Sequence, residues 1–236
     1  MASTKMELPD CQHCKSRANS LFHFCHLDEI EEINLNKSCT IYKRSQILFQ
    51  EGSKPMGLYC INSGRIKVYK YASDGKEQII RIAKPGDFVG YSSLLTGKHY
   101  PVSAAALEDS TVCLVPKDKI TGLFGDNQNF SEGLINLLCS TIETSYEKMT
   151  DLAYKPVKGR MAEALLLLNQ TYTTDENPEG VISITREDLA SLVGTVKETA
   201  IRVLKEFKDE NLVSTDKTKI IIEDRNGLNR ISRLYD

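Results

Sequence analysis

The chain has 236 residues, a formal net charge of −2 and 41% hydrophobic residues. This length suits one large domain or two modest ones, and the composition excludes disorder and a collagen-like chain. The longest aliphatic stretch is far shorter than the ~20 residues that span a bilayer, and the first ten residues hold no apolar signal region. We therefore expect a cytoplasmic protein with no membrane partner. Because the net charge is slightly negative, any nucleic-acid binding needs a local basic patch.

Seven cysteines are the first feature that could carry chemistry; they stand at positions 11, 14, 25, 39, 60, 113 and 139. The odd number and scattered spacing argue against a disulfide framework. Cys39, Cys60 and Cys113 lie in strand-like runs, where a thiol usually behaves as a small hydrophobe. Cys11 and Cys14 form a C-x2-C pair near the N-terminus.

The first half of the chain has the pattern of a short helix followed by many strands. Residues 27–37 predict an amphipathic helix, and residues 38–116 are short β-prone runs separated by glycine, of which Thr40–Phe49 is the first. Asp74-Gly75 between alternating runs predicts a hairpin. Strands at 8–12 residue intervals predict a small antiparallel barrel or roll.

Residues 127–154 predict one long helix. Apolar residues recur with 3-4 spacing, interrupted by one serine, at Ile135, Leu138, Ile142, Ser145, Met149 and Leu152. Such a narrow seam favours a homodimeric coiled coil. The alternative is a helix that packs on its own barrel. Tyr154-Lys155-Pro156 predicts a hinge after this helix, since proline suits a first helical turn.

The segment from residue 156 to the end predicts a second compact unit. A helix over 156–172 and a polar loop over 173–180 precede two further helices joined by a turn that contains Gly194. We expect Thr185 to cap the first of this pair and Thr195, with Glu198, to cap the second. An alternating hairpin around Asp216-Lys217 follows.

Two capped helices joined by a short turn are typical of a helix-turn-helix. The second helix turns one face inward and leaves a polar face that could read the major groove. The candidate DNA-contacting residues are Arg186, Thr195, Lys197, Glu198, Ile201, Arg202, Lys205 and Lys217. This unit has 12 lysines and arginines against 14 acidic residues, so the electrostatic attraction to DNA must be local. Similar helix pairs also occur in ordinary protein cores.

The order of these elements, and three motifs, resemble the Crp–Fnr family of bacterial transcription regulators. The motifs are Gly64–Tyr69, Pro85–Gly90 and Ile184–Thr199. The resemblance implies an α+β protein with an N-terminal antiparallel β-roll, which is the cyclic-nucleotide-binding-like jelly roll, then a long dimerisation helix and a C-terminal winged helix-turn-helix. The implied domains are residues 1–126, 127–155 and 156–236.

The resemblance also implies how DNA is read. Glu198 and Arg202 match the pair with which the family reads a G·C-containing core of each half-site. Lys197 stands where nucleotide-responsive members carry an arginine. The implied partners are double-stranded DNA with a palindromic operator, a second copy of the chain and RNA polymerase.

The cyclic-nucleotide site of the family lacks its usual residues in this sequence. Tyr91 stands in place of the glutamate that holds the ribose, and Tyr100-Pro101-Val102 replaces the arginine pair for the phosphate. A buried phosphate without a guanidinium would be unpaired, so cyclic AMP is disfavoured as the effector.

The sequence resembles the oxygen-sensing branch of the family, which binds an iron–sulfur cluster, more than it resembles the cyclic-AMP-binding members. Cys11, Cys14 and Cys113 fall on three of its four ligand positions, whereas the remaining position is Ser20 and Cys25 is a possible fourth ligand. Thiolates suit such a cluster. The alternatives are a vestigial segment with ordinary buried thiols, and zinc on Cys11 and Cys14 with His13 or His26.

These observations favour a dimeric transcription regulator that responds to a redox, oxygen or nitric-oxide-type signal. The sequence does not identify the residues that bind the effector. The alternative is a small-molecule-binding regulatory module with its effector in the roll and no DNA reading. An enzyme is not expected, because the sequence contains no catalytic triad setting, phosphate loop or paired-carboxylate motif.

Overall fold

The computed structural model describes residues 9–234, which form two compact units. One unit contains residues 9–70 and 81–142, and the other contains residues 71–80 and 143–234. The expected lack of a signal region concerns residues that lie partly outside the described range. None of the helices within that range has the length and apolar character needed to cross a membrane.

The N-terminal part of the first unit is helical. It contains the short 3-10 helices η1 (Lys15–Asn19) and η2 (Leu21–Phe24), followed by α1 (Leu27–Asn36). The backbone N–H of His26 donates to the Glu29 carboxylate at 2.7 Å, which satisfies one free donor at the start of α1. Ile30 and Ile33 are fully buried, so α1 packs its apolar face inward as the sequence predicts.

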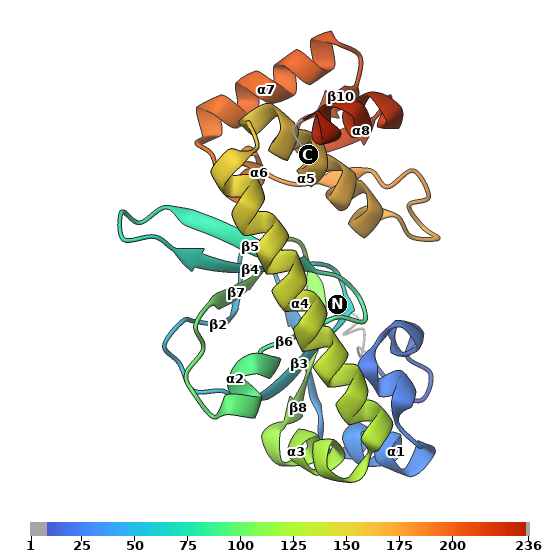
Figure 1. Cartoon of the computed structure of the whole chain (residues 1–236). Helices are drawn as coiled ribbons and strands as arrows, with labels where there is room; N and C mark the ends of the chain where they lie inside the picture. The colour runs from blue at the N-terminus through green and yellow to red at the C-terminus, as the bar shows by residue number, and fades with distance from the viewer. Residues whose placement is uncertain (1–8, 235–236) are drawn as a thin grey trace, which may run out of the picture. The chain divides into compact units, whose positions relative to one another are not determined.

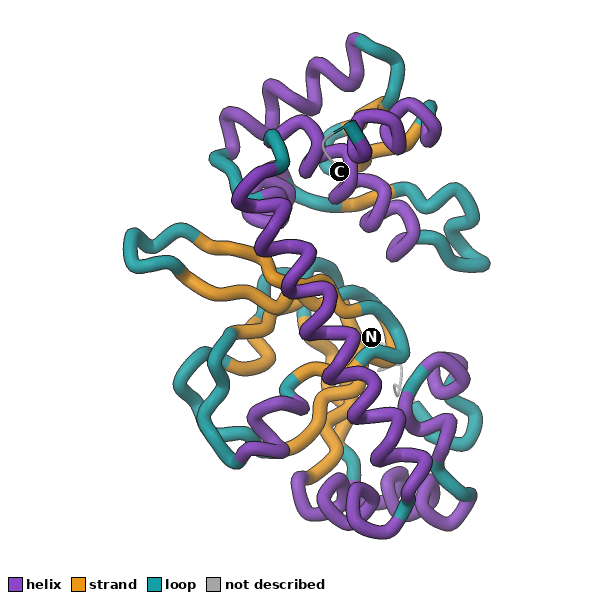
Figure 2. The backbone as a smooth tube through the Cα atoms, in the orientation of Figure 1, coloured by secondary structure: helices purple, strands orange, loops and turns teal. Residues whose placement is uncertain are grey.

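Eight strands form the predicted roll (Figures 1 and 2). Their pairing gives two four-stranded sheets, with the orders β1-β8-β3-β6 and β2-β7-β4-β5. The strand bounds are β1 (Ser38–Tyr42), β2 (Ile47–Phe49), β3 (Gly57–Ser63), β4 (Ile66–Tyr71), β5 (Glu77–Ala83), β6 (Phe88–Val89), β7 (Ser103–Ala106) and β8 (Ser110–Pro116). Asp74-Gly75 lies in the β4–β5 turn, where Gly75 has φ +80°, so the hairpin prediction is confirmed.

The run Thr40–Phe49, predicted as one strand, is two strands that belong to different sheets. The chain breaks at Ser45, which has φ +67°, and its backbone N–H donates to the carbonyl of Ala106. The sequence analysis also missed α2 (Tyr91–Thr96) and α3 (Lys117–Asp126). Both are short helices that depend on packing against the roll rather than on a long periodic pattern.

The predicted long helix is confirmed as α4 (Gln128–Tyr154). The Asn127 side chain accepts from the backbone N–H of Phe130 at 2.9 Å and so caps its first turn. Phe130 and Leu134 are buried in the core of the first unit. At Gly133 a Cβ would meet the Phe24 ring at 2.8 Å, so the N-terminal segment can approach α4 only at a glycine.

The second unit contains the predicted helix pair and hairpin, together with α8, which was not predicted. Its elements are α5 (Val157–Tyr172), β9 (Ile182–Ser183), α6 (Arg186–Val193), α7 (Lys197–Asp209), β10 (Val213–Asp216), β11 (Lys219–Ile222) and α8 (Arg225–Arg233). The three strands pair in the order β10-β11-β9. Leu165 and Leu228 are fully buried in the helical part. The three-part domain division predicted above stays a prediction, since the boundary between the two units falls inside α4.

Candidate nucleic-acid interface and cysteine cavity

Side-chain hydrogen bonds hold both the start of α6 and the turn between α6 and α7. The Thr185 hydroxyl accepts from the backbone N–H of Asp188 at 2.9 Å, so the predicted cap of α6 is present. Gly194 ends α6 with φ +72°. Arg160 donates to the carbonyls of Val193 and Gly194 at 2.9 and 3.1 Å. These bonds satisfy carbonyls at the end of α6 and fix the direction in which α7 leaves the turn.

The predicted cap of α7 is wrong. Its N-cap residue is Val196, whose side chain accepts no hydrogen bond from the first turn. Thr195 instead lies half-buried in the turn, with its backbone N–H donating to the carbonyl of Ala190 at 3.0 Å. The extra residue between Gly194 and the helix moves Thr195 one position too early to cap it.

Helix α7 has one buried face and one exposed polar face. The buried face consists of Ala200, Val203, Leu204 and Phe207. Five of the predicted DNA-contacting residues are exposed: Lys197, Glu198, Ile201, Arg202 and Lys205. Ile201 is 45% exposed and lies between Glu198 and Arg202 on this face. The structure therefore brings these five residues onto the accessible side of one helix.

Two of the exposed cations on α7 have acidic partners. Lys197 pairs with Glu187 of α6, and this contact raises the pKa of Lys197 and lowers the pKa of Glu187. Arg202 pairs with Glu206 one turn along the helix at 2.9 Å. Exposed pairs of this kind are weak, so a stronger acceptor such as a guanine edge or a phosphate can displace them.

Arg186 and Lys217 lie together although they are 31 residues apart. The Arg186 guanidinium donates to the Lys217 carbonyl at 3.0 Å, and its Nη1 atom is buried without a hydrogen-bond partner among the described residues. Burial lowers the pKa of Arg186. Lys217 lies in the β10–β11 turn with φ +49°, and it is exposed. Arg186 thus connects α6 to the hairpin, whereas the Lys217 side chain is free to meet solvent or DNA.

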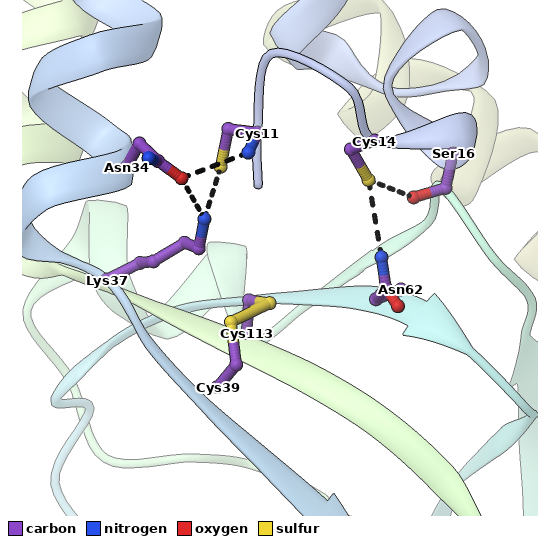
Figure 3. Close-up of a disulfide and its surroundings, with 8 residues drawn as sticks. All are labelled: Cys11, Cys14, Ser16, Asn34, Lys37, Cys39, Asn62 and Cys113. Carbon is purple, nitrogen blue, oxygen red and sulfur yellow. Dashed lines mark hydrogen bonds between the residues drawn. A yellow bond between two sulfur atoms is a disulfide. The ribbon is translucent and has the colours of Figure 1, made fainter. Parts of the chain in front are cut away.

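The first unit contains a cavity of about 20 Å³ lined by four cysteines: Cys11, Cys14, Cys60 and Cys113. Cys113 of β8 is opposite Cys39 of β1 on one side and opposite Cys60 of β3 on the other. Cys39 and Cys113 form a disulfide, which Figure 3 shows beneath Cys11 and Cys14. The sequence analysis expected no disulfide, because the spacing along the chain does not reveal that the register of β1 and β8 places these two residues opposite each other.

Cys11 and Cys14 accept hydrogen bonds beside this cavity. The Lys37 ammonium donates to the Cys11 sulfur at 3.1 Å, and the Asn62 amide donates to the Cys14 sulfur at 3.3 Å (Figure 3). The Cys11 backbone N–H donates to Asn34 at 3.0 Å. Burial raises the pKa of Cys11, although Lys37 opposes the rise. Neither Lys37 nor Asn62 was singled out in the sequence.

The ligand set predicted for a cluster lacks a fourth thiolate in this structure. The Ser20 hydroxyl donates to the Arg17 carbonyl at 2.9 Å. Cys25 is buried in an apolar cluster with Phe22 and Ile30, which raises the pKa of its thiol to about 12. Cys113 is already bonded to Cys39. The predicted set therefore does not fit a cluster in the disulfide form.

The described histidine, cysteine and acidic side chains contain no group of three placed to hold a metal ion in this form. His13 is exposed, and its Nδ1 atom lies 2.5 Å from a carboxylate oxygen of Asp10. This hydrogen bond lowers the pKa of Asp10. His26 is also exposed, at the start of α1. The structure thus does not bring these two histidines together with Cys11 and Cys14 as a zinc site.

The positions of the cyclic-nucleotide site are occupied by aromatic side chains. Tyr100 is buried and stacks on Phe49 with 4.0 Å between ring centroids. The ring centroids of Tyr59 and Phe49 are 5.4 Å apart in the same core. The Tyr91 hydroxyl lies 2.9 Å from that of Thr141 on α4. Burial raises the pKa of Tyr100 to about 12, so this phenol stays neutral.

Comparison with known protein families matches two parts of the chain. Residues 40–127 match the cyclic nucleotide-binding domain, and residues 159–231 match the Crp-like helix-turn-helix domain. The first match covers most of the roll, and the second covers α6, α7 and the hairpin that carries Lys217.

Comparison with characterised proteins gives the same assignment. The chain is 29% identical over 221 residues to the Anaerobic regulatory protein of Haemophilus influenzae, covering 92% of this chain and 86% of that protein. It is 28% identical over 230 residues to the Fumarate and nitrate reduction regulatory protein of Escherichia coli, covering 94% and 90%. Its fold is similar to that of FixK2 from Bradyrhizobium japonicum, with a TM-score of 0.76 and 21% identity over 85% of this chain and 99% of that one. With the roll, the long helix and the helix-turn-helix in family order, the chain belongs to the Crp/Fnr family of DNA-binding transcription regulators.

Proposed function

We propose that this protein is a homodimeric transcription regulator that reads a palindromic operator and changes its DNA affinity in response to a redox, oxygen or nitric-oxide-type signal. The observation that carries the proposal is the exposed face of α7, where Glu198, Ile201 and Arg202 are all accessible on a helix whose opposite face is buried. The charged side chains on this exposed face, together with Ile201, offer both hydrogen-bonding and apolar contacts on one helix.

Each of these three side chains suits a different base edge in the major groove. The Arg202 guanidinium can donate two hydrogen bonds to guanine, and the Glu198 carboxylate can accept one from the cytosine amine. Ile201 can contact a thymine methyl group. Together they would specify a G·C-containing core in each half-site.

The phosphate contacts would come from a local cluster of cations. Lys197, Lys205 and Lys217 are exposed on α7 and on the hairpin turn. Arg186 would position the turn through its bond to the Lys217 carbonyl. Thr195, at the start of the turn into α7, could donate its hydroxyl to a phosphate. Such contacts fix register and orientation without reading sequence.

The homodimer is supported by the apolar stripe on α4. Ile135 and Ile142 are each 49% exposed, Met149 is 67% exposed and Leu152 is 44% exposed. An exposed apolar row with 3-4 spacing is the pattern of a helix that pairs with another copy. Because two identical chains are related by a two-fold axis, such a dimer would read two inverted half-sites.

The signal is supported by the cysteines and by the relatives. The proteins that this chain is similar to include an anaerobic regulatory protein and a fumarate and nitrate reduction regulatory protein. Tyr91 and Tyr100 occupy positions where a cyclic nucleotide would need a carboxylate and a guanidinium, which disfavours cyclic AMP. We further propose that the protein acts in the cytoplasm with RNA polymerase as partner, and that it is not an enzyme.

The experiment is a selection of binding sites from random double-stranded DNA with the full chain, carried out with and without oxygen. The expected result is an inverted repeat with a G·C pair in each half-site, bound with different affinity under the two conditions. The double variant Glu198→Ala/Arg202→Ala should lose the enriched sequence. The control Lys208→Ala changes an exposed cation on the last turn of α7 and should retain it.

Failure to enrich any sequence under either condition would contradict the proposal. It would favour the alternative of a small-molecule-binding module, in which the effector lies in the roll and the C-terminal helices serve only to pack.

A further inference from the structure

We propose that Arg160 is a positioning residue that connects helix α4 to the reading helix α7, so that a dimer paired through α4 holds its two reading helices at one distance and angle. All residues of this connection belong to the second unit, which contains residues 71–80 and 143–234. The inference rests on the proposed dimeric DNA reading, and it adds how the pairing of two copies sets the geometry of that reading.

The Arg160 guanidinium bonds the ends of two helices at once. Its Nε and Nη2 atoms donate to the carbonyls of Val193 and Gly194, at the end of α6, at 2.9 and 3.1 Å. Its Nη1 atom donates to the carbonyl of Lys155, directly after α4, at 2.7 Å and lies 3.5 Å from the carbonyl oxygen of Leu152. Because Arg160 itself belongs to α5, one side chain joins three helices.

Arginine suits this position for two physical reasons. The last carbonyls of a helix have no partner within the helix, and together they carry a partial negative charge. A guanidinium is always positively charged and has five N–H donors in a rigid plane, so it can bond carbonyls of both helix ends and fix their separation. A lysine ammonium lacks this plane and would hold the two ends less strictly.

The same two helix ends also touch directly. A Cβ at Gly194 would lie 2.6 Å from the Leu152 side chain, so α4 approaches the turn before α7 at a distance that only glycine allows. Leu152 is also the last residue of the apolar stripe on α4, and it is 44% exposed. In the proposed dimer, Leu152 would therefore contact both the partner copy and the turn that directs α7.

Close packing alone does not make this junction stiff. A cavity of about 70 Å³ lies beside it, and the lining side chains include Asp151, Arg160, Glu163, Leu167 and Leu192. Side chains that face a void lose the contacts that would resist movement. We therefore assign the stiffness of the junction to the hydrogen bonds of Arg160.

Stiffness at this junction matters because the dimer must meet two half-sites together. If each α7 is fixed relative to its α4, the second half-site is met at high effective concentration only when the spacing is correct. If the connection is loose, each α7 still fits its own half-site, but the two copies gain less from being linked. Arg160 should therefore affect the dependence on spacing and leave the base preference unchanged.

The experiment measures the affinity of the full chain for its selected operator and for the same operator with about five base pairs inserted between the half-sites. The wild type should prefer the unmodified operator. Arg160→Gln should reduce this preference at least about tenfold, since linked binding contributes roughly 10²–10⁴-fold. The base preference within each half-site, and the dimer measured by sedimentation, should stay as in the wild type.

Arg225→Gln is the matched control. The Arg225 guanidinium donates to the Asn169 side chain at 2.9 Å and so joins α8 to α5 of the same unit. The same substitution at this position should leave the spacing preference unchanged. Arg160→Lys is a second variant in case Arg160→Gln does not fold, and it should also lower the spacing preference because an ammonium cannot bridge the two helix ends in the same way.

A second measurement needs no DNA. In the ¹⁵N relaxation of the wild type, the amides of α7 should tumble together with those of residues 143–154 at the end of α4. In Arg160→Gln the amides of α7 should tumble faster than those of α4. Failure of the wild type to select any operator would contradict the proposed function, and the relaxation measurement would still decide the role of Arg160.

The inference is overturned if Arg160→Gln, folded as judged by circular dichroism, keeps both the spacing preference and the tumbling of the wild type. Independent tumbling of α7 in the wild type would also overturn it. So would a loss of base preference at a single half-site in Arg160→Gln, because Arg160 would then hold the helix-turn-helix itself together rather than set its direction.

Discussion

The Arg202 side chain is 67% exposed and is held by Glu206 one helical turn away. An exposed i,i+4 pair contributes only about 0.3–0.5 kcal/mol. Another hydrogen-bond acceptor can therefore replace Glu206 as the partner of the guanidinium. A bidentate contact to guanine would be stronger and would replace it.

We predict that Arg202→Ala reduces discrimination at one base pair of each half-site by about 1–3 kcal/mol and leaves the other positions unchanged. Lys217→Ala should instead weaken binding to all sequences alike, because a phosphate contact carries no sequence information. Gel-shift titrations against a panel of single-base operator variants measure both effects. An unchanged base preference in Arg202→Ala would mean that another element reads the core.

Among the elements, the two helices of the helix-turn-helix begin differently although both are preceded by a threonine. Thr185 accepts from the first turn of α6, whereas the turn places Val196 rather than Thr195 at the N-cap of α7. Substituting a capping threonine by alanine costs about 1 kcal/mol on average. The sequence alone predicts equal roles for the two threonines.

We predict that Thr185→Ala lowers the local stability of α6 by about 1 kcal/mol and that Thr195→Ala does not lower that of α7. Amide hydrogen exchange of the two helices in the full chain is the measurement, since it reports local opening separately for each helix. Equal loss of protection in α7 for Thr195→Ala would show that Thr195 caps that helix in solution.

Helix α4 carries several apolar side chains that are exposed in this structure. Ile142 lies near the middle of the stripe and is 49% exposed. Asn136 is also exposed but lies outside the 3-4 seam, one residue after Ile135. These two positions separate the effect of the seam from the effect of an added charge.

We predict that Ile142→Glu dissociates the homodimer, because two-fold symmetry would place two like charges opposite each other in an apolar interface. Asn136→Glu should leave the dimer intact. Sedimentation equilibrium at micromolar concentration measures both. A wild-type protein that is monomeric in this experiment would rule out pairing through α4.

For the whole molecule, the charge of the DNA-reading unit places a limit on how it binds. The segment from residue 156 onward has more acidic than basic residues, so a single copy would be attracted to DNA only through its local cluster of lysines and arginines. Two copies on one operator double the number of such contacts, and the linked second contact occurs at high effective concentration.

We predict that the two half-sites of the selected operator lie about one helical turn apart, with centres roughly 34–36 Å from each other. Inserting about five base pairs between them turns one half-site to the opposite face of the duplex and should reduce affinity to that of one half-site. Quantitative gel shifts with spacer variants provide the measurement. Affinity that does not depend on the spacer would indicate binding by independent copies.

Much of this organisation could be predicted from the sequence because it depends on local pattern. Short β-prone runs separated by glycine predicted the roll. The period of apolar residues predicted the long helix, and the exposed face around Arg202 followed from helical spacing. The six-residue helix α2 was missed because it is too short to show a period and forms only when packed. Helix α8 was not singled out although, with nine residues, it is longer than α6.

Amino-acid order alone determined that this chain contains a β-roll, a heptad-spaced helix and a helix-turn-helix with charged residues on one face, since each follows from the spacing of neighbouring residues. Only the tertiary structure decided that Cys39, Cys113 and Cys60 lie in one row and that Cys11 and Cys14 lie above them. Residues that are 74 positions apart become partners through strand register, and that register is set by the burial of whole strand faces rather than by the cysteines themselves.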